Sequence, residues 1–230
     1  MNIAGVPPFP RPQLGRPRLR IIDLEGPAGR LEAVVNEAAP GAPCAALVCH
    51  PHPKGGGSLH NKVVYHCMKV LNAPEWGFQL PVLRFNFRGT GRSEGVHDGK
   101  AETGDVQAAV RWLENEYRLP IVAAGFSFGA AMALKALCGS AVKAVAALGL
   151  PTHAEGRSYH YSFLKSCPQP KLLLSGDCDQ YATPDELAGV TAAASEPRRL
   201  ILIPGADHFF TGHLAAMQQA LAQWLKEQLS

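Results

Sequence analysis

Apolar residues along this chain gather in short runs that are separated by longer, mixed stretches. From residue 45 onwards the runs show no alternation of polar and apolar positions, as expected for strands that are covered on both faces. The pattern predicts six such strands, at 45–50, 81–87, 121–127, 144–150, 171–177 and 200–206.

The stretches between these runs predict helices at 61–72, 102–117, 128–137 and 184–194. A last helix begins near residue 213, and its apolar residues recur at spacings of three and four: Leu214, Met217, Leu221 and Trp224. Such a stripe is typical of a helix face that packs on a core.

Two earlier apolar segments, 19–26 and 30–38, are joined by Pro-Ala-Gly and predict an antiparallel hairpin. A hairpin followed by repeated strand–helix units predicts an α/β fold, with a doubly wound, mostly parallel sheet and helices on both faces. No repeat, linker or low-complexity stretch divides residues 19–230. We therefore expect one domain, preceded by an extended tail at 1–18 that is rich in proline and arginine.

Charge is unevenly spread along the chain. The first twenty residues hold four arginines and no acidic residue, and without them the 22 basic residues fall to 18, against 19 acidic ones. A nucleic-acid-binding domain concentrates basic residues on its folded surface, so we do not expect a nucleic-acid partner. We expect no membrane partner either, because no run approaches the ~18 apolar residues that a membrane span requires.

The six cysteines show no C-x-x-C spacing, and several lie inside apolar runs. In a chain of this length the pattern predicts buried free thiols in a reducing compartment. The start of the chain has no apolar stretch long enough for a signal peptide. We therefore expect a cytoplasmic protein, and the sequence leaves open whether it is a monomer or a homodimer.

The motif G-x-S-x-G occurs as Gly125-Phe126-Ser127-Phe128-Gly129. By composition alone it would occur by chance in roughly one chain in ten of this size. Here a predicted strand precedes it and a predicted helix follows at once, as in a nucleophile elbow. Such a sharp turn crowds its neighbours, so the positions two before and two after the serine must lack bulk. We predict Ser127 as a nucleophile.

A serine nucleophile needs a base, and the base needs an orienting acid. Asp177 and Asp179 both lie at the carboxyl end of the strand that begins at 171, past residues 171–174. We favour Asp179 as the acid, because the loop must extend before it turns towards a histidine. Asp177 directly follows Gly176 and is better explained as tying down the turn.

His208 follows the strand at 200–206 and is the predicted base. His213 is the alternative, but it lies where the last helix begins, and a role at the helix end suits it better. Asp207 is expected to shape the loop, since its side chain should point away from that of His208. Because sites in open α/β sheets form at the carboxyl ends of strands, Ser127, Asp179 and His208 can meet there.

The segment HPHPKGGG at 50–57 directly follows the first fully apolar strand. An acyl-transfer site needs two N–H donors for the developing oxyanion, one from the residue after the nucleophile, Phe128, and one from a loop after an earlier strand. Pro51 and Pro53 have no N–H. We therefore predict the His52 amide as the second donor, with Lys54 in reserve.

His50, His52 and His60 also raise the alternative of a zinc site. The prolines fix the backbone so that the first two rings need not face a common point, and no carboxylate or cysteine completes a ligand set at ordinary spacing. We expect the imidazoles to hydrogen-bond within the loop, and we expect no metal.

Taken together, these segments resemble the α/β-hydrolase superfamily, and most of all its small lidless branch related to dienelactone hydrolases and bacterial serine esterases. The resemblance covers residues 19–230 and rests on HPHPKGGG (50–57), LRFNFRGTGRSEG (83–95), ETGDVQAAVRWL (102–113), GFSFGA (125–130), SGDCDQYATP (175–184) and GADHFF (205–210). It implies Ser127 as nucleophile, His208 as base and Asp179 as acid. Dienelactone hydrolases proper use a cysteine as nucleophile, so lactone opening is not implied.

The family often inserts a lid after the sixth strand of the full fold, but the corresponding segment here, 151–170, is too short for a helical cap. We therefore expect an open site. Tyr159, Tyr161 and Phe163 either edge a pocket for a small acyl group or pack the loop down, and the sequence does not decide between these.

The segment RGTGRSEG at 88–95 lacks the lysine and the spacing of a phosphate-binding P-loop. We expect its glycines to shape a turn and one of its arginines, Arg88 or Arg92, to pair with Glu94, Asp98 or Asp105.

These features predict a cofactor-free serine hydrolase that cleaves small carboxylic esters through an acyl-enzyme. A thioesterase with the same three residues is the alternative, and a non-catalytic binding protein on the same fold is a second one. The sequence specifies neither the acyl group nor the alcohol or thiol of the small-molecule substrate.

Overall fold

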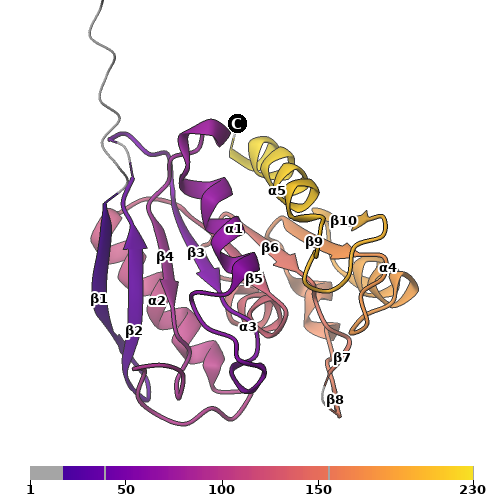
Figure 1. The fold of residues 1–230 in the computed structure, drawn as a ribbon, viewed down its shortest axis with the longest axis horizontal. Helices are drawn as coiled ribbons and strands as arrows, with labels where there is room; N and C mark the ends of the chain where they lie inside the picture. Colours follow the sequence, from indigo (N-terminus) through magenta and orange to yellow (C-terminus); the bar gives the residue numbers. More distant parts are fainter. Residues whose placement is uncertain (1–17, 39, 155, 230) are drawn as a thin grey trace, which may run out of the picture.

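A computed structural model describes residues 18–38, 40–154 and 156–229, which form a three-layered α/β structure (Figure 1). Its main sheet has eight strands in the order β1-β2-β4-β3-β5-β6-β9-β10. Their bounds are Leu19–Gly26 (β1), Gly29–Asn36 (β2), Ala45–Cys49 (β3), Val82–Phe85 (β4), Ile121–Phe126 (β5), Ala144–Leu148 (β6), Lys171–Gly176 (β9) and Arg198–Ile203 (β10). The pairs β1–β2 and β2–β4 are antiparallel, and all other neighbours in this sheet are parallel.

Helices cover both faces of this sheet. They are Lys62–Asn72 (α1), Glu102–Tyr117 (α2), Phe128–Leu137 (α3), Pro184–Ala193 (α4) and Leu214–Leu229 (α5), with short 3₁₀ turns at Pro53–Gly55 (η1), Pro74–Trp76 (η2) and Ser162–Ser166 (η3). Buried residues of α2, α3 and α4 share one apolar layer, and those of α1 and α5 share the other (Figure 1). The predicted fold class is therefore confirmed.

Strand β3 shows why the central runs lack polar positions. Ala45, Leu47 and Cys49 point into the layer of α2 and α3, whereas Ala46 and Val48 point into the layer of α1 and α5. Successive side chains of a strand point to opposite faces of the sheet. Because helices cover both faces, every position of the strand is shielded from water and can be apolar.

Several predicted boundaries differ from those observed. The strands β4 and β6 end two residues earlier than the apolar runs, and β10 covers Arg198–Ile203 rather than 200–206. The last strand lies at the sheet edge, where charged side chains can reach solvent, so its start carries two arginines. The predicted stripe of α5 buries Met217, Leu221 and Trp224.

The segment after β6 forms no helical cap within the described residues. It contains a small hairpin, His153–Ala154 (β7) and Arg157–Ser158 (β8), followed by the turn η3. The hairpin projects beyond the main sheet (Figure 1). The predicted tail lies almost entirely outside the described residues.

All six cysteines are free thiols, and four of them are buried: Cys44, Cys49, Cys67 and Cys167. Burial raises the pKa of the Cys44 thiol to about 11 and that of Cys67 to about 12, so both stay protonated at neutral pH. Within the described ranges, no helix is long and apolar enough to cross a membrane.

Candidate active site

Ser127 occupies the turn between β5 and α3 with a strained backbone, φ 55° and ψ −120°. The two flanking glycines explain how the chain reaches it. A Cβ on Gly125 would collide with the backbone of Gly129, and a Cβ on Gly129 would lie 2.6 Å from the Cys49 carbonyl oxygen. Strand and helix can approach this closely only when both positions lack side chains, as a nucleophile elbow requires.

His208 and Asp179 form a buried pair on the loops that follow β10 and β9. Nδ1 of His208 lies 2.8 Å from Oδ2 and 3.0 Å from Oδ1 of Asp179. The carboxylate also accepts hydrogen bonds from the Ser175 hydroxyl and the Tyr181 backbone N–H, each at 2.8 Å. The proton between the pair belongs on Nδ1, which leaves Nε2 of His208 as a proton acceptor.

Aromatic rings fix the plane of the His208 imidazole. Tyr181, Phe126 and Phe209 lie 4.5, 5.0 and 5.1 Å from it, between ring centroids, and only 2% of His208 is exposed. Gly149, at the end of β6, makes room for the ring, because a Cβ there would lie 3.1 Å from Cε1 of His208.

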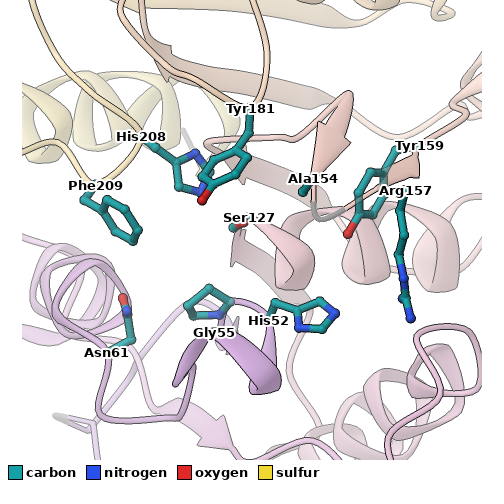
Figure 2. A pocket seen from close by; sticks show the side chains of 11 residues that line it. His52, Gly55, Asn61, Ser127, Ala154, Arg157, Tyr159, Tyr181, His208 and Phe209 are labelled. Atoms are coloured by element: carbon teal, nitrogen blue, oxygen red, sulfur yellow. The ribbon is translucent and has the colours of Figure 1, made fainter.

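Ser127 and His208 face the same pocket, with the imidazole directed towards the serine (Figure 2). The pocket has a volume of about 80 Å³. Its lining residues are Pro51, His52, Gly55, Asn61, Ser127, Ala154, Arg157, Tyr159, Tyr181, His208 and Phe209. The structure therefore brings the three predicted site residues together at the carboxyl ends of β5, β9 and β10.

The alternative acids and base have other contacts. Asp177 accepts a hydrogen bond from the Gly205 N–H at 2.7 Å and so ties the β9 loop to the β10 loop. Asp207 accepts one from the Thr211 N–H at 2.8 Å, and backbone hydrogen bonds of this kind lower the pKa of its carboxyl. His213 directly precedes α5, and its Nδ1 lies 2.9 Å from the Thr211 carbonyl oxygen.

Of the two predicted oxyanion donors, Phe128 directly follows Ser127, and His52 lines the same pocket as Ser127. Phe128 is the first residue of α3, so its N–H has no acceptor within the helix and points along the positive end of the helix dipole. His52 lies on the facing loop, and its ring packs edge-on against Phe128 at 5.0 Å between centroids. The N–H of Lys54 already donates to Nδ1 of His52 at 3.2 Å, which argues against Lys54 as the reserve donor.

His50 is fully buried and links two loops. Its Nδ1 lies 2.6 Å from the Pro51 carbonyl oxygen, and its Nε2 accepts a hydrogen bond from the Phe87 N–H at 3.0 Å. Burial lowers the pKa of His50 to about 4, so the ring is neutral at pH 7. Both ring nitrogens thus have partners within the protein. In the described part of the chain, no group of three His, Cys, Asp or Glu residues is arranged to hold a metal ion.

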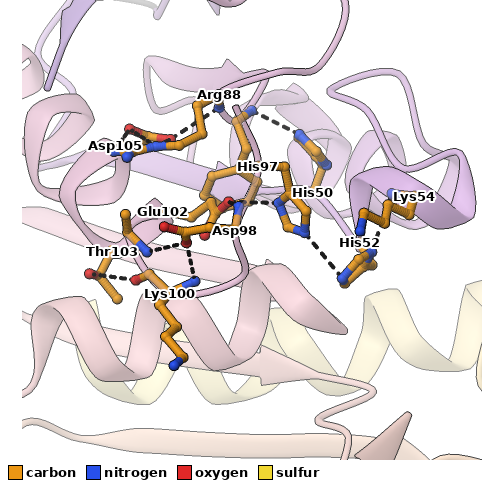
Figure 3. A network of polar contacts seen from close by, with 12 residues as sticks. His50, His52, Lys54, Arg88, His97, Asp98, Lys100, Glu102, Thr103 and Asp105 are labelled. Carbon is orange, nitrogen blue, oxygen red and sulfur yellow. Dashed lines mark hydrogen bonds and ion pairs between the residues drawn. The ribbon is translucent and has the colours of Figure 1, made fainter. Parts of the chain in front are cut away.

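A chain of polar contacts extends from His52 to a buried carboxylate (Figure 3). Nε2 of His52 lies 3.3 Å from Nε2 of His97, and Nδ1 of His97 lies 2.6 Å from Oε1 of Glu102. The last pair meets at an angle outside the hydrogen-bonding range, so we treat it as an electrostatic contact. Glu102 is fully buried, and its Oε1 also accepts a hydrogen bond from the Asp98 N–H.

One arrangement of protons is compatible with the hydrogen bonds of His52 in this chain. The Lys54 N–H can only donate, so Nδ1 of His52 accepts and Nε2 of His52 carries the proton. That proton points to Nε2 of His97, which must then accept, and the His97 proton sits on Nδ1, facing Glu102. In this arrangement the neutral form of the His52 ring has a single allowed tautomer, with its proton on Nε2.

Arg88 and Asp105 form an ion pair behind the loop, with Nη2 of the arginine 2.6 Å from Oδ1. The Asp105 side chain is fully buried, and its hydrogen bonds raise the pKa of the Arg88 guanidinium. Arg92 instead lies 3.7 Å from Glu32. The glycine-rich segment is thus a turn braced by Arg88, as expected.

Comparison with known proteins identifies the family. Residues 50–228 match the family described as "Alpha/beta hydrolase domain". The chain belongs to the α/β-hydrolase family. This hydrolase is 36% identical over 214 residues to an uncharacterized protein of Rickettsia prowazekii, a match that covers 89% of the chain and 87% of that protein.

Two solved structures are similar to this hydrolase along most of its length. An α/β serine hydrolase homologue from Coxiella burnetii is 32% identical, with a TM-score of 0.80, over 90% of this chain and 97% of that one. A lidless α/β serine hydrolase from Xanthomonas campestris is 28% identical, with a TM-score of 0.79, over 91% and 94%. Family and fold together support hydrolase activity.

The three aromatic residues predicted to edge the pocket of this hydrolase separate in space. Tyr159 lines the pocket of Ser127, whereas Tyr161 and Phe163 do not and line a neighbouring hollow. The Tyr161 hydroxyl donates to the Pro151 carbonyl oxygen at 2.5 Å, and both rings pack against the core. For these two residues the alternative, that they pack the loop down, describes the structure better.

Five pocket residues escaped the sequence analysis: Asn61, Ala154, Arg157, Tyr181 and Phe209. Tyr181 and Phe209 lie within two residues of Asp179 and His208, so proximity in sequence was a usable signal. The Asn61 side chain accepts a hydrogen bond from the Val63 N–H and so caps α1. This capping role would by itself have explained an asparagine at this position in the sequence. Arg157 had no signal, because it reaches the pocket on the β7–β8 hairpin.

Proposed function

We propose that this hydrolase cleaves small carboxylic esters through an acyl-enzyme on Ser127. The observation that carries the proposal is the pocket shared by a serine on a strained elbow and a buried histidine held by Asp179. The Ser127 hydroxyl attacks the acyl carbon while Nε2 of His208 removes its proton. Asp179 keeps the other imidazole proton on Nδ1 and stabilises the imidazolium that forms.

The tetrahedral intermediate places a negative charge on the former carbonyl oxygen. The amides of Phe128 and His52 donate to this oxyanion, and the positive end of α3 adds to its stabilisation. His208 then returns its proton to the departing alkoxide. In the second half, His208 activates a water molecule that attacks the acyl carbon, and Ser127 regains its proton.

The size of the pocket argues for a short acyl group. Its volume of about 80 Å³ is several times the roughly 10–15 Å³ that a cavity needs to hold one water molecule. An acyl group of a few carbon atoms fits within this pocket.

A panel of acyl esters of graded chain length, each with its matched thioester, tests this proposal on the wild type and on Ser127→Ala. We expect turnover of short oxyesters, and at least a ~10³-fold loss of kcat in the variant because nothing replaces the nucleophile. Thermal unfolding should stay nearly unchanged. Ser166→Ala, at an exposed serine in η3, is the matched control and should retain full activity.

Other outcomes would favour the alternatives. Faster turnover of the thioester than of its oxyester at every chain length would make the protein a thioesterase. Turnover that survives in Ser127→Ala would remove this residue as nucleophile. A folded wild type that cleaves no compound of the panel would support a non-catalytic binding protein.

A further inference from the structure

A second hollow opens beside the catalytic pocket, with a volume of about 650 Å³. Arg157 and Tyr159 line both spaces, so the hollow adjoins the pocket. The residues around it are Asp98, Gly99, Lys100, Ala131, Met132, Lys135, Arg157, Ser158, Tyr159, His160, Tyr161 and Phe163. Because the pocket itself holds only a few atoms, the rest of a substrate has room in this hollow.

The rim of the hollow is positively charged. Lys100, Lys135 and Arg157 come from three different elements, and none of them forms an ion pair with any carboxylate in the described ranges. Asp98 is the one carboxylate among the lining residues, and its Oδ1 accepts hydrogen bonds from the N–H groups of Lys100 and Ala101. Outside the first twenty residues, basic and acidic residues are nearly balanced, so a basic surface overall does not explain this concentration.

The position of Arg157 is set by a close contact with Gly99. A Cβ on Gly99 would collide with the Arg157 guanidinium, so the group lies directly against the backbone of this turn. Gly99 has φ +81°, which suits glycine and leaves the space open. The guanidinium thus connects the β7–β8 hairpin to the turn before α2, and Arg157 borders both the pocket, where Figure 2 shows it, and the hollow.

The inner wall of the hollow is apolar. Met132, Tyr161 and Phe163 contribute to it, and all three pack against the core. An apolar wall below a cationic rim fits a ligand with a short hydrocarbon or aromatic part that ends in a negative charge.

We propose that the hollow binds an anionic group of the substrate, a carboxylate or a phosphate, and that this enzyme prefers esters carrying one. Arg157, Lys100 and Lys135 attract this anionic group. The group lies in the hollow while the ester bond lies at Ser127 in the pocket. The proposal rests on the proposed ester hydrolysis and specifies its substrate class.

Pairs of esters that differ only in charge test this proposal. On the acyl side, the 4-nitrophenyl half-ester of glutaric acid is compared with its neutral methyl ester. On the alcohol side, 4-carboxyphenyl and 4-phosphonophenyl butyrate are compared with neutral 4-carbamoylphenyl butyrate. We expect a higher kcat/KM for the anionic ester than for its neutral partner in at least one of these pairs. The pair that shows this preference identifies whether the anionic group belongs to the acyl or the alcohol part, and whether it is a carboxylate or a phosphonate.

The double variant Lys100→Gln, Lys135→Gln locates the effect. Each of these lysines would form a partly exposed ion pair with the anionic group of the substrate. The double variant should therefore lower the ratio of anionic to neutral kcat/KM by roughly 5- to 10-fold, and higher salt should lower the same ratio in the wild type. Lys165→Gln, at an exposed lysine on η3 outside both spaces, should leave the ratio unchanged.

Equal kcat/KM within every pair, or an anionic preference that survives in the double variant, would overturn the anionic site. The neutral esters and Ser127→Ala separate this failure from failure of the proposed function. If the wild type cleaves neutral esters and Ser127→Ala does not, ester hydrolysis stands even when the charge preference is absent.

Discussion

At the scale of single residues, the site depends on positions that carry no reactive group. Gly125 and Gly129 let Ser127 take a backbone conformation that a crowded turn would forbid. Gly149 leaves space for the His208 ring. The motif G-x-S-x-G predicts the first two from sterics alone, whereas the third depends on a neighbour 59 positions away in the chain.

Glu102 is the residue whose role a variant can test most sharply. In Glu102→Gln the carboxylate that faces Nδ1 of His97 is replaced by an amide, so the His97 ring, which contacts Nε2 of His52, is held less firmly. The His52 amide should then be less well placed for the oxyanion. Steady-state kinetics on a short ester should show kcat lower by roughly 10- to 100-fold, with KM nearly unchanged.

The matched control is Glu114→Gln, at an exposed position on the same helix α2. It should leave both kinetic constants as they are. An unchanged kcat in Glu102→Gln, or a loss fully explained by a lower unfolding temperature, would mean that Glu102 only stabilises the loop.

At the scale of elements, the apolar runs predicted every strand of the main sheet, because each central strand is covered on both sides. The start of β10 was misplaced, because Arg198 and Arg199 interrupt the apolar pattern. Both reach carboxylates outside the sheet, Glu196 and Glu227, which an edge strand permits.

The part of the candidate site that lies at the ends of parallel strands was predictable from the sequence. The carboxyl ends of parallel strands meet at one edge, so Ser127, Asp179 and His208 followed from their places after β5, β9 and β10. Residues on other loops did not follow. Arg157 enters on a hairpin of two-residue strands, and the placement of such a hairpin depends on tertiary contacts like that with Gly99.

At the scale of the whole molecule, His50 connects the loop after β3 to the segment after β4, because its ring accepts a hydrogen bond from the Phe87 N–H. Because the His50 ring is buried in the folded protein, its protonation favours unfolding. Burial lowers its pKa from 6.5 to about 4, so between these pH values the unfolded chain binds more protons than the folded one. The stabilisation is complete above pH 6.5 and is lost as the pH falls through about 4.

The difference between the two pKa values corresponds to about 3 kcal/mol for this fully buried ring. Urea unfolding at pH 7, 5.5 and 4 should therefore show a falling free energy of unfolding in the wild type. His50→Gln should be less stable at pH 7 and show a weaker pH dependence. The control His60→Gln, at an exposed histidine, should keep the wild-type slope. Equal slopes in His50→Gln and the wild type would contradict this account.

The central claim is that Ser127 is activated by His208 and that Asp179, rather than its neighbour Asp177, orients the histidine. The most direct measurement is the rate at which a fluorophosphonate modifies the protein, with the modified peptide identified by mass spectrometry. The account predicts one label, on Ser127. It also predicts labelling that is roughly 100-fold slower or more in Asp179→Asn and nearly unchanged in Asp177→Asn. A label on another residue, or equal labelling rates in Asp179→Asn and the wild type, would contradict it.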